Sequence, residues 1–183
     1  MLFRSGARAR VPEIPGLVNS GFLTNETIFS LTQQPRRLIV LGGGPIGCEL
    51  AQAFARLGSE VTLIDTGSRL LPRDDEVASR LVQDQLLADG VTLHFETQVV
   101  LVQTREGARV VHFQNCSGRH SIETDAILVA TGRVPNTEGL ALERAGVRFH
   151  VQTGVEVDDF LRTDRKSTRL NSSHSSVSRM PSS

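Results

Sequence analysis

Residues 38–47, LIVLGGGPIG, constrain the fold more than any other part of the sequence. The continuous apolar run 38–41 is typical of a strand that is buried on both faces. Three glycines follow it directly, and Pro45 is suited to the first position of a helix. Helical spacing then relates four apolar residues, Ile46, Leu50, Phe54 and Leu57. Gly58 is suited to the C-terminal cap, so the stretch predicts a strand, a sharp bend and a helix.

A second predicted strand, VTLID at residues 61–65, completes a βαβ unit whose crossover should be right-handed. Asp74, Asp75 and Glu76 then place negative charge at the start of a second helix, where the helix dipole favours it. We expect Val77, Leu81 and Leu87 to line one face of that helix and Gly90 to end it. Residues 91–96, VTLHFE, predict a third strand.

The following segment predicts antiparallel strands instead of another crossover helix. Three strand-like pieces, VVLVQ, ARVVHFQ and HSIET, are separated by the turn sequences TREG and NCSGR. Residues 126–132, AILVATG, predict a fourth parallel strand. We further expect short helices at residues 24–31 and 138–146, and an extended segment at 154–163. The fold class is therefore α/β, a Rossmann-like parallel sheet with an antiparallel β-meander crossover.

The glycines have a spacing that suits a dinucleotide. Gly42, Gly44 and Gly47 form G-x-G-x-x-G between a predicted strand and a predicted helix. In this motif the glycines allow the turn, the close approach of a pyrophosphate and tight helix packing, and the helix N-terminus holds the anion. Asp65 ends the next strand, at the roughly 20-residue spacing of an acid that binds the adenosine ribose. The alternative is a glycine-rich turn without a ligand.

Asp65 also favours NAD over NADP, because a carboxylate repels the 2′-phosphate of NADP. Arg69 and Arg73 in the same loop leave NADP open, since arginine is the usual partner of that phosphate. Their alternative interpretation is that of solvated loop charges.

Composition excludes several other classes of protein. The 183 residues carry 20 basic and 20 acidic side chains, so no overall field attracts nucleic acid or an anionic membrane. No apolar run reaches the ~20 residues of a membrane helix, and no secretory signal begins the chain, so we expect a cytoplasmic protein. Cys48 and Cys116 have neither metal-type nor redox-type spacing. We interpret Cys48 as a buried packing residue and Cys116 as an inert turn residue.

Residues 164–183 differ from the rest of the chain. They are rich in serine, nearly free of apolar residues and without periodicity, so we expect them to be disordered. They are either a natural serine-rich tail or, as we favour, the translation of a sequencing-library adapter, which the segments DRKSTRLNSSH and SRMPSS resemble.

Residues 6–163 resemble the flavin-dependent pyridine nucleotide-disulfide oxidoreductases, the family of dihydrolipoamide dehydrogenase, glutathione reductase and mercuric reductase. The resemblance is carried by LIVLGGGPIGCELAQAFARLGSEVTLID, AILVATGRVPNTEGL and GVEVDDFLRT. The opening SGARARVPEIPGL is similar to the stretch after the first A-T-G motif of the family, although Arg4-Ser5-Gly6 replaces Ala-Thr-Gly here.

The resemblance implies a set of residues that bind the nicotinamide dinucleotide. The pyrophosphate-binding residues would be Gly42, Gly43, Gly44, Pro45, Ile46 and Gly47. Asp65 would bind the ribose, Val99 would line the adenine side and Gly132 would lie near the nicotinamide half. Glu49 would face the nicotinamide and pair with a flavin-domain lysine, or it is simply an acid in the first turn of a helix.

The departures from the family imply a fragment. The chain lacks the Cys-x-x-x-x-Cys disulfide, a second dinucleotide fingerprint for FAD and the C-terminal dimerisation domain, so no catalytic or metal-binding residue is predicted in it. The implied domains are residues 1–34 as a connecting arm from a truncated FAD domain, 35–150 as the NAD(P)-binding domain and 151–163 as the return segment. The parent would be an FAD-dependent homodimer that moves hydride between NAD(H), FAD and a dithiol.

Three alternatives to a dihydrolipoamide dehydrogenase-like parent remain open. They are an NADPH-dependent mercuric reductase, a flavin NADH reductase without the disulfide, and a free-standing nucleotide-binding module.

Overall fold

The computed structural model describes residues 6–105 and 107–163, which form two compact units. The first unit is Ala9–Gly132, and the second consists of the described residues of 1–8 and 133–183. The predicted tail at 164–183 and the Arg4-Ser5 replacement lie outside the described residues. Within the described ranges, no helix has both the length and the apolar character that crossing a membrane requires.

A four-stranded parallel sheet is the centre of the first unit, with the strand order β4-β3-β2-β8. The strands are β2 (Arg37–Leu41), β3 (Glu60–Ile64), β4 (Thr92–His94) and β8 (Ala126–Val129). Leu38 of β2 lies opposite Val61 on one side and Ala126 on the other. The four parallel strands predicted from sequence are confirmed, and their carboxyl ends meet at one edge of the sheet.

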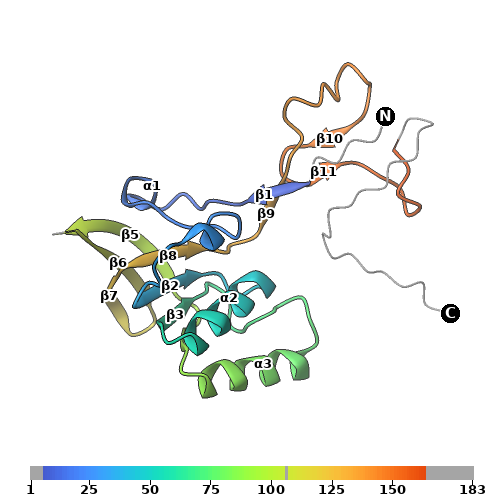
Figure 1. Cartoon of the computed structure of the whole chain (residues 1–183). Helices are drawn as coiled ribbons and strands as arrows, with labels where there is room; N and C mark the ends of the chain where they lie inside the picture. The colour runs from blue at the N-terminus through green and yellow to red at the C-terminus, as the bar shows by residue number, and fades with distance from the viewer. Residues whose placement is uncertain (1–5, 106, 164–183) are drawn as a thin grey trace. The chain divides into compact units, whose positions relative to one another are not determined.

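Two helices, α2 (Pro45–Arg56) and α3 (Glu76–Ala88), cover one face of this sheet (Figure 1). Pro45 occupies the start of α2, and Gly58 just beyond its end has a left-handed φ of +99°. Asp75 caps α3, because its carboxylate accepts the N–H groups of Val77 at 2.8 Å and Ala78 at 3.3 Å. The predicted starts of both helices are therefore confirmed.

The face that α3 buries differs from the predicted one. Val77, Leu81 and Leu87 are 67%, 66% and 50% exposed. The helix instead buries Leu86 and Ser79, whose hydroxyl donates to the carbonyl of Leu70 at 2.6 Å. The prediction was wrong because a satisfied hydroxyl can face the core, whereas hydropathy alone places apolar side chains there.

The predicted antiparallel meander is present as a three-stranded sheet in the order β5-β6-β7. Its strands are β5 (Gln98–Arg105), β6 (Ala108–Asn115) and β7 (Gly118–Thr124). With α1 (Leu17–Ser20), it covers the face of the parallel sheet opposite α2 and α3. Residues of β2 alternate between the two cores: Leu38 and Val40 pack with the helices, and Ile39 and Leu41 pack with the meander. This is the pattern of a strand buried on both faces.

The arm before β2 contains less helix than expected. The predicted helix at residues 24–31 is a turn followed by the short 3-10 helix η1 (Ile28–Ser30). The backbone N–H of Thr24 donates to the Thr27 hydroxyl at 2.9 Å. This contact closes the turn that precedes η1.

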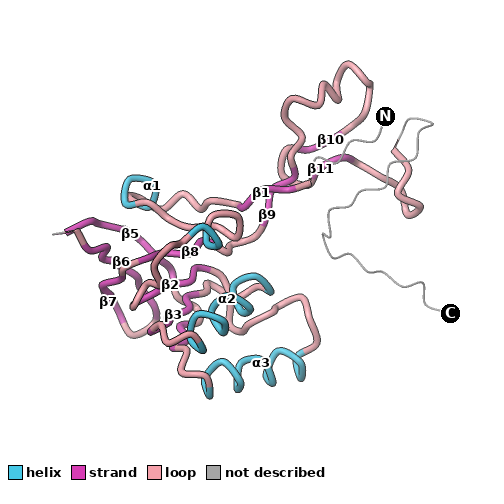
Figure 2. Tube along the Cα trace, in the orientation of Figure 1, coloured by secondary structure: helices cyan, strands magenta, loops and turns pink. Residues whose placement is uncertain are grey.

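The second unit contains only short strands. Ala7 and Arg8 of β1 (Ala7–Ala9) lie beside β9 (Arg133–Pro135), and β10 (Phe149–His150) pairs with β11 (Gly154–Val155). The short helix predicted at 138–146 is wrong: the stretch forms turns, drawn as loop in Figure 2, and Ala141 has a left-handed φ of +48°.

The predicted extended segment at 154–163 is confirmed only at its start. After β11 the Asp158 carboxylate accepts the N–H groups of Phe160 at 2.9 Å and Arg162 at 2.8 Å, so the chain turns there.

Candidate functional site

The glycine-rich bend lies at the carboxyl edge of the parallel sheet, where β2 leads into α2. Gly42 has a φ of +109°, and its N–H donates to the carbonyl of Ile64 in β3 at 2.9 Å. A Cβ added to Gly42 would lie 2.5 Å from the carbonyl oxygen of Ala130, which follows β8. Both the left-handed backbone and this close neighbour restrict the position to glycine.

Gly47 permits the close contact between α2 and the end of β2. A Cβ at this position would lie 1.9 Å from the carbonyl oxygen of Gly42. Because that neighbour is backbone, it cannot move aside as a flexible side chain could. Gly47 therefore has a packing role, as the motif predicts.

Gly44 differs from the other two glycines because its surroundings are open. A Cβ built on it would meet nothing within 4 Å, and its φ of −78° is ordinary. Gly44 is the N-cap of α2, and among the described residues no side chain caps that helix. The first N–H groups of a helix have no partner within the helix, so this end combines open space with donors that suit a phosphate. Pro45, which is exposed, and Ile46, which is half-buried, begin the first turn of the same helix.

Asp65 lies directly at the bend. It follows β3, and its carboxylate accepts the backbone N–H groups of Gly43 and Gly67. The backbone of Asp65 is also held, because its N–H donates to the carbonyl of His94 at 2.9 Å and its carbonyl accepts the N–H of Thr97 at 3.0 Å. The structure thus brings the predicted acid into direct contact with Gly43 of the predicted glycine motif.

The other three residues predicted to bind the cofactor are Val99, Gly132 and Glu49. Val99 is half-buried in β5, two residues after the Thr97 amide that binds Asp65. Gly132 is exposed with a φ of +110°, two residues after Ala130, which contacts the bend. Glu49 is exposed on α2.

The loop at residues 69–74 packs on the glycine bend. The sequence predicted only that it carries the charges of Arg69 and Arg73. Leu70 is fully buried, and its side chain lies 2.8 Å from the position of a Cβ on Gly43. The N–H of Leu71 donates to the carbonyl of Gly43 at 2.9 Å. Arg69 is half-buried, and its guanidinium donates to carbonyls of its own loop. Arg73 is exposed.

Cys48 is buried beneath the bend, as expected for a packing residue, and its thiol donates to the carbonyl of Gly43 at 3.5 Å. Burial raises the pKa of this thiol to about 11, and the negative charges of Asp65, Glu49 and Asp74 add to the effect. Such a thiol is protonated at neutral pH and is a poor nucleophile. Cys116 is exposed in the turn between β6 and β7.

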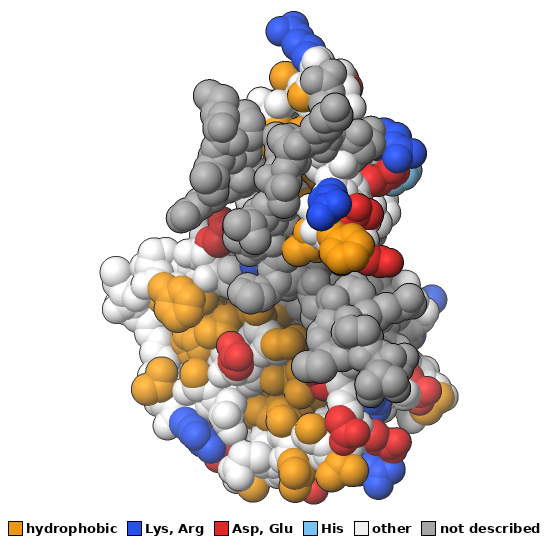
Figure 3. All heavy atoms as spheres, turned by 90° about the vertical axis from the view of Figure 1, so that its right-hand side faces the viewer, with side chains coloured by type: hydrophobic (Ala, Val, Ile, Leu, Met, Phe, Trp, Pro, Cys, Tyr) orange, Lys and Arg blue, Asp and Glu red, His pale blue; other side chains and the backbone are white. Residues whose placement is uncertain are grey.

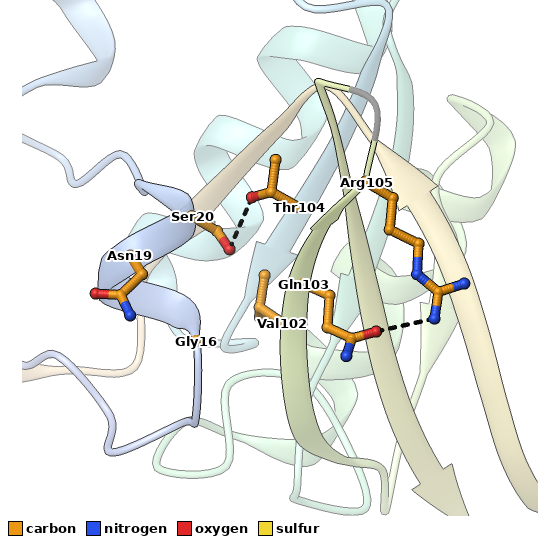
Figure 4. A pocket seen from close by; sticks show the side chains of 7 residues that line it. All are labelled: Gly16, Asn19, Ser20, Val102, Gln103, Thr104 and Arg105. Carbon is orange, nitrogen blue, oxygen red and sulfur yellow. Dashed lines mark hydrogen bonds between the residues drawn. The ribbon is translucent and has the colours of Figure 1, made fainter.

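Two further features of the first unit lie outside this constellation. A shallow groove of about 470 Å³ runs between α1 and β5 and is lined mainly by polar side chains, among them Asn19, Gln103 and Arg105 (Figure 4). It contains none of the predicted cofactor-binding residues. In residues 6–105 and 107–163, no three His, Cys, Asp or Glu side chains are placed to hold a metal ion.

Comparison with known proteins finds a matching family model and relatives of the same family. Residues 2–167 match the family model described as pyridine nucleotide-disulphide oxidoreductase. The chain is 38% identical over 163 residues to a mercuric reductase of Streptomyces lividans, covering 89% of this chain and 34% of that protein. It is 39% identical over 142 residues to the dihydrolipoyl dehydrogenase of Bacillus subtilis, covering 78% of this chain and 30% of that protein.

A solved structure agrees with these sequence matches. The Cu(II) complex of the HOCl-induced flavoprotein disulfide reductase RclA from Escherichia coli superposes with a TM-score of 0.79 at 33% identity, covering 88% of this chain and 36% of RclA. The chain thus spans about a third of the length of the relatives it matches. With a parallel sheet, an antiparallel meander and a family model that matches nearly its whole length, the chain belongs to the pyridine nucleotide-disulphide oxidoreductase family.

Proposed function

We propose that this chain is the nicotinamide-dinucleotide-binding part of a flavin-dependent disulfide oxidoreductase. The observation that carries the proposal is the hydrogen bond from the N–H of Gly43 to the carboxylate of Asp65. It joins the place where a pyrophosphate would lie to the acid that would bind a ribose. One ligand that carries both groups at a short spacing is a dinucleotide.

Each part of the constellation has its own task in this proposal. The free N–H groups at the start of α2, next to Gly44, would hold the pyrophosphate. Asp65 would accept hydrogen bonds from the ribose hydroxyls, because a carboxylate oxygen has lone pairs left beside the one that accepts a backbone N–H. Val99 would line the adenine side and Gly132 the nicotinamide half, with Glu49 facing the nicotinamide.

The proposed cofactor is NAD. The Asp65 carboxylate would repel a 2′-phosphate, and the guanidinium of Arg69 is turned to the carbonyls of its own loop. This preference supports a dihydrolipoamide dehydrogenase-like parent more than an NADPH-dependent mercuric reductase.

Members of the family use FAD and NAD(P) and are usually homodimers. We infer the same for the parent of this chain, with FAD supplying the acceptor for hydride, and we place it in the cytoplasm. Residues 1–34 and 151–163 would connect this part to the flavin domain.

The first unit exposes large apolar side chains such as Val18, Phe29 and Leu57. Figure 3 shows one face on which hydrophobic side chains gather around isolated acidic ones. Further parts of a longer chain would cover such surfaces.

The test is a titration of the purified chain with NADH and with NADPH, followed by the fluorescence of the reduced nicotinamide. We expect NADH to bind about tenfold more tightly than NADPH, which corresponds to about 1.4 kcal/mol. Tighter binding of NADPH would overturn the assignment of Asp65. Absence of binding for both dinucleotides would overturn the proposed function of this chain.

A further inference from the structure

The peptide groups on either side of Gly43 are held from several directions. The N–H of Gly43 donates to the Asp65 carboxylate. Its carbonyl accepts the N–H of Leu71 at 2.9 Å and the Cys48 thiol at 3.5 Å. With its N–H held by Asp65 and its carbonyl held by Leu71 and Cys48, Gly43 fixes the chain just before Gly44, whose extended conformation opens the start of α2.

One of these contacts depends on a backbone conformation that its residue disfavours. Leu71 has a φ of +47°, which lies in the left-handed region. A branched side chain rarely adopts that region, because its Cβ crowds the following carbonyl oxygen. Leu71 therefore needs contacts from the rest of the loop to keep its N–H directed at Gly43.

Arg69 supplies most of those contacts, beside the N–H of Asp74, which donates to the carbonyl of Leu71 at 3.0 Å. Its guanidinium donates to the carbonyls of Leu71 at 3.1 Å, Pro72 at 3.0 Å and Asp74 at 3.1 Å, and weakly to that of Leu70 at 3.5 Å. A planar fork with five N–H donors can hold several oxygens at once, which the point charge of a lysine cannot do with the same geometry. The start of the loop is also anchored by the Ser79 hydroxyl of α3, which donates to the carbonyl of Leu70 at 2.6 Å.

We propose that Arg69 is a positioning residue for the glycine bend. By holding residues 70–74, it keeps the N–H of Leu71 on the carbonyl of Gly43 and so maintains the bend in the shape that receives a pyrophosphate. What the bend receives rests on the proposed function, whereas the action of Arg69 on Leu71 and Gly43 concerns this chain alone.

This role differs measurably from that of a cationic contact to the 2′-phosphate of NADP. If Arg69 made such a contact, its replacement by glutamine would weaken the binding of NADPH only. Replacement by lysine would preserve much of the NADPH affinity, because the positive charge remains. A positioning role affects NADH and NADPH equally, since both carry the same pyrophosphate, and a lysine cannot restore it.

The experiment compares Arg69→Gln and Arg69→Lys with the matched control Arg73→Gln, which removes an exposed arginine of the same loop. Amide hydrogen exchange at Leu71, followed by NMR without any ligand, reports directly on the bond to Gly43. NADH and NADPH affinities are then measured on the same samples, at a temperature where thermal unfolding shows that every variant is folded.

We expect both Arg69 variants to speed amide exchange at Leu71 by about tenfold. We also expect them to weaken the binding of NADH and of NADPH by the same factor of about tenfold, as for the loss of hydrogen bonds to a charged group. In the Arg73 variant, the exchange rate at Leu71 and the affinities for NADH and NADPH should stay within about twofold of their values in the unaltered chain, the scale of an ordinary surface substitution. Unchanged exchange at Leu71, a loss confined to NADPH, or full rescue by lysine would each overturn the proposal. If the unaltered chain binds neither dinucleotide while Arg69→Gln still speeds exchange, the proposed function fails and the positioning of the bend stands.

Discussion

The carboxylate of Asp65 accepts the backbone N–H of Gly43, a residue 22 positions earlier in the chain. A second carboxylate oxygen accepts the N–H of Gly67 at 2.5 Å, so this one side chain joins the end of β2 to the loop after β3. Asp65 therefore shapes the bend even without a ligand. Stability and cofactor binding should respond together when it is changed.

Replacement of Asp65 by asparagine should lower the free energy of unfolding by about 1–3 kcal/mol, measured by urea denaturation. An amide offers one acceptor oxygen where the carboxylate offers two, so one of the two backbone N–H groups loses its partner. The affinity for NADH should fall, and the ratio of NADH to NADPH affinity should move toward NADPH because a negative charge is removed. Asp84→Asn, at an exposed position on α3, is the matched control. Equal losses in both variants would contradict the role of Asp65.

Substitution of alanine for Gly44 should weaken NADH binding by about tenfold or more while the fold is retained. A new methyl group at Gly44 meets nothing within 4 Å in the protein, but it would occupy the space proposed for the pyrophosphate. The φ of −78° is compatible with alanine, and the entropy gain of this change is opposed by the poorer capping of alanine, so the free energy of unfolding should change by less than about 1 kcal/mol. Unaltered NADH affinity in a folded variant would mean that the phosphates lie elsewhere.

The same substitution at Gly47 should act on stability instead. Its methyl group would lie 1.9 Å from the carbonyl oxygen of Gly42, so α2 would have to move away from the sheet. We expect a loss of about 3 kcal/mol in the free energy of unfolding, the upper part of the range for overpacked positions. Chemical denaturation of the Gly44 and Gly47 variants side by side provides the control, and equal stability of the two would refute this packing role.

Thiol labelling should distinguish the two cysteines. With a pKa near 11, Cys48 is about 0.1% thiolate at pH 8, and it is buried as well. Exposed Cys116 should therefore react rapidly with a thiol reagent, and Cys48 only after the protein is unfolded by urea. Mass spectrometry of the labelled peptides measures both rates. Fast labelling of Cys48 in the folded chain would show that the core beneath the bend opens readily.

His94 should make the stability depend on pH. Burial lowers the pKa of its imidazole below the ordinary 6.5, and the nearby charge of His120 adds to the effect. In the window between the lowered pKa and 6.5 the unfolded chain binds more protons than the folded one, so the free energy of unfolding rises with pH there. Below that window the stabilisation is lost.

The replacement of His94 by glutamine removes this group and should flatten the profile in the window just below pH 6.5. The measurement is urea denaturation at several pH values for the two proteins. A profile that keeps its slope after the replacement would assign the pH dependence to other groups.

Much of the candidate site could be predicted from sequence because its features are local. The apolar run that ends in glycine, the proline at the start of a helix and the acid at the end of the next strand each depend on neighbours along the chain. Their meeting at one sheet edge then follows because the two strands of a βαβ unit are parallel. The contact of Asp65 with Gly43 agrees with that reasoning.

Other features of the fold and of the site could not be predicted from such local patterns. The spacing of Val77, Leu81 and Leu87 predicted a buried face, but α3 turns Ser79 and Leu86 inward because the carbonyl of Leu70 satisfies the serine hydroxyl. The helix expected at residues 138–146 did not form, although its sequence contains suitable helix formers. The role of Thr97, whose N–H holds the backbone of Asp65, had no signal in the sequence at all.

The amino-acid sequence by itself determined where this chain forms its parallel strands and its meander, where it must bend and which acid faces the bend, since backbone preferences and the period of apolar residues are set locally. Only the tertiary structure decided that Arg69 turns to the carbonyls of its own loop, that Leu71 and Cys48 both bind Gly43, and that Val77, Leu81 and Leu87 of α3 are exposed. The physical reason is that the choice among hydrogen-bond partners and buried faces depends on the free energy of the whole packed chain, in which local preferences are a minor part.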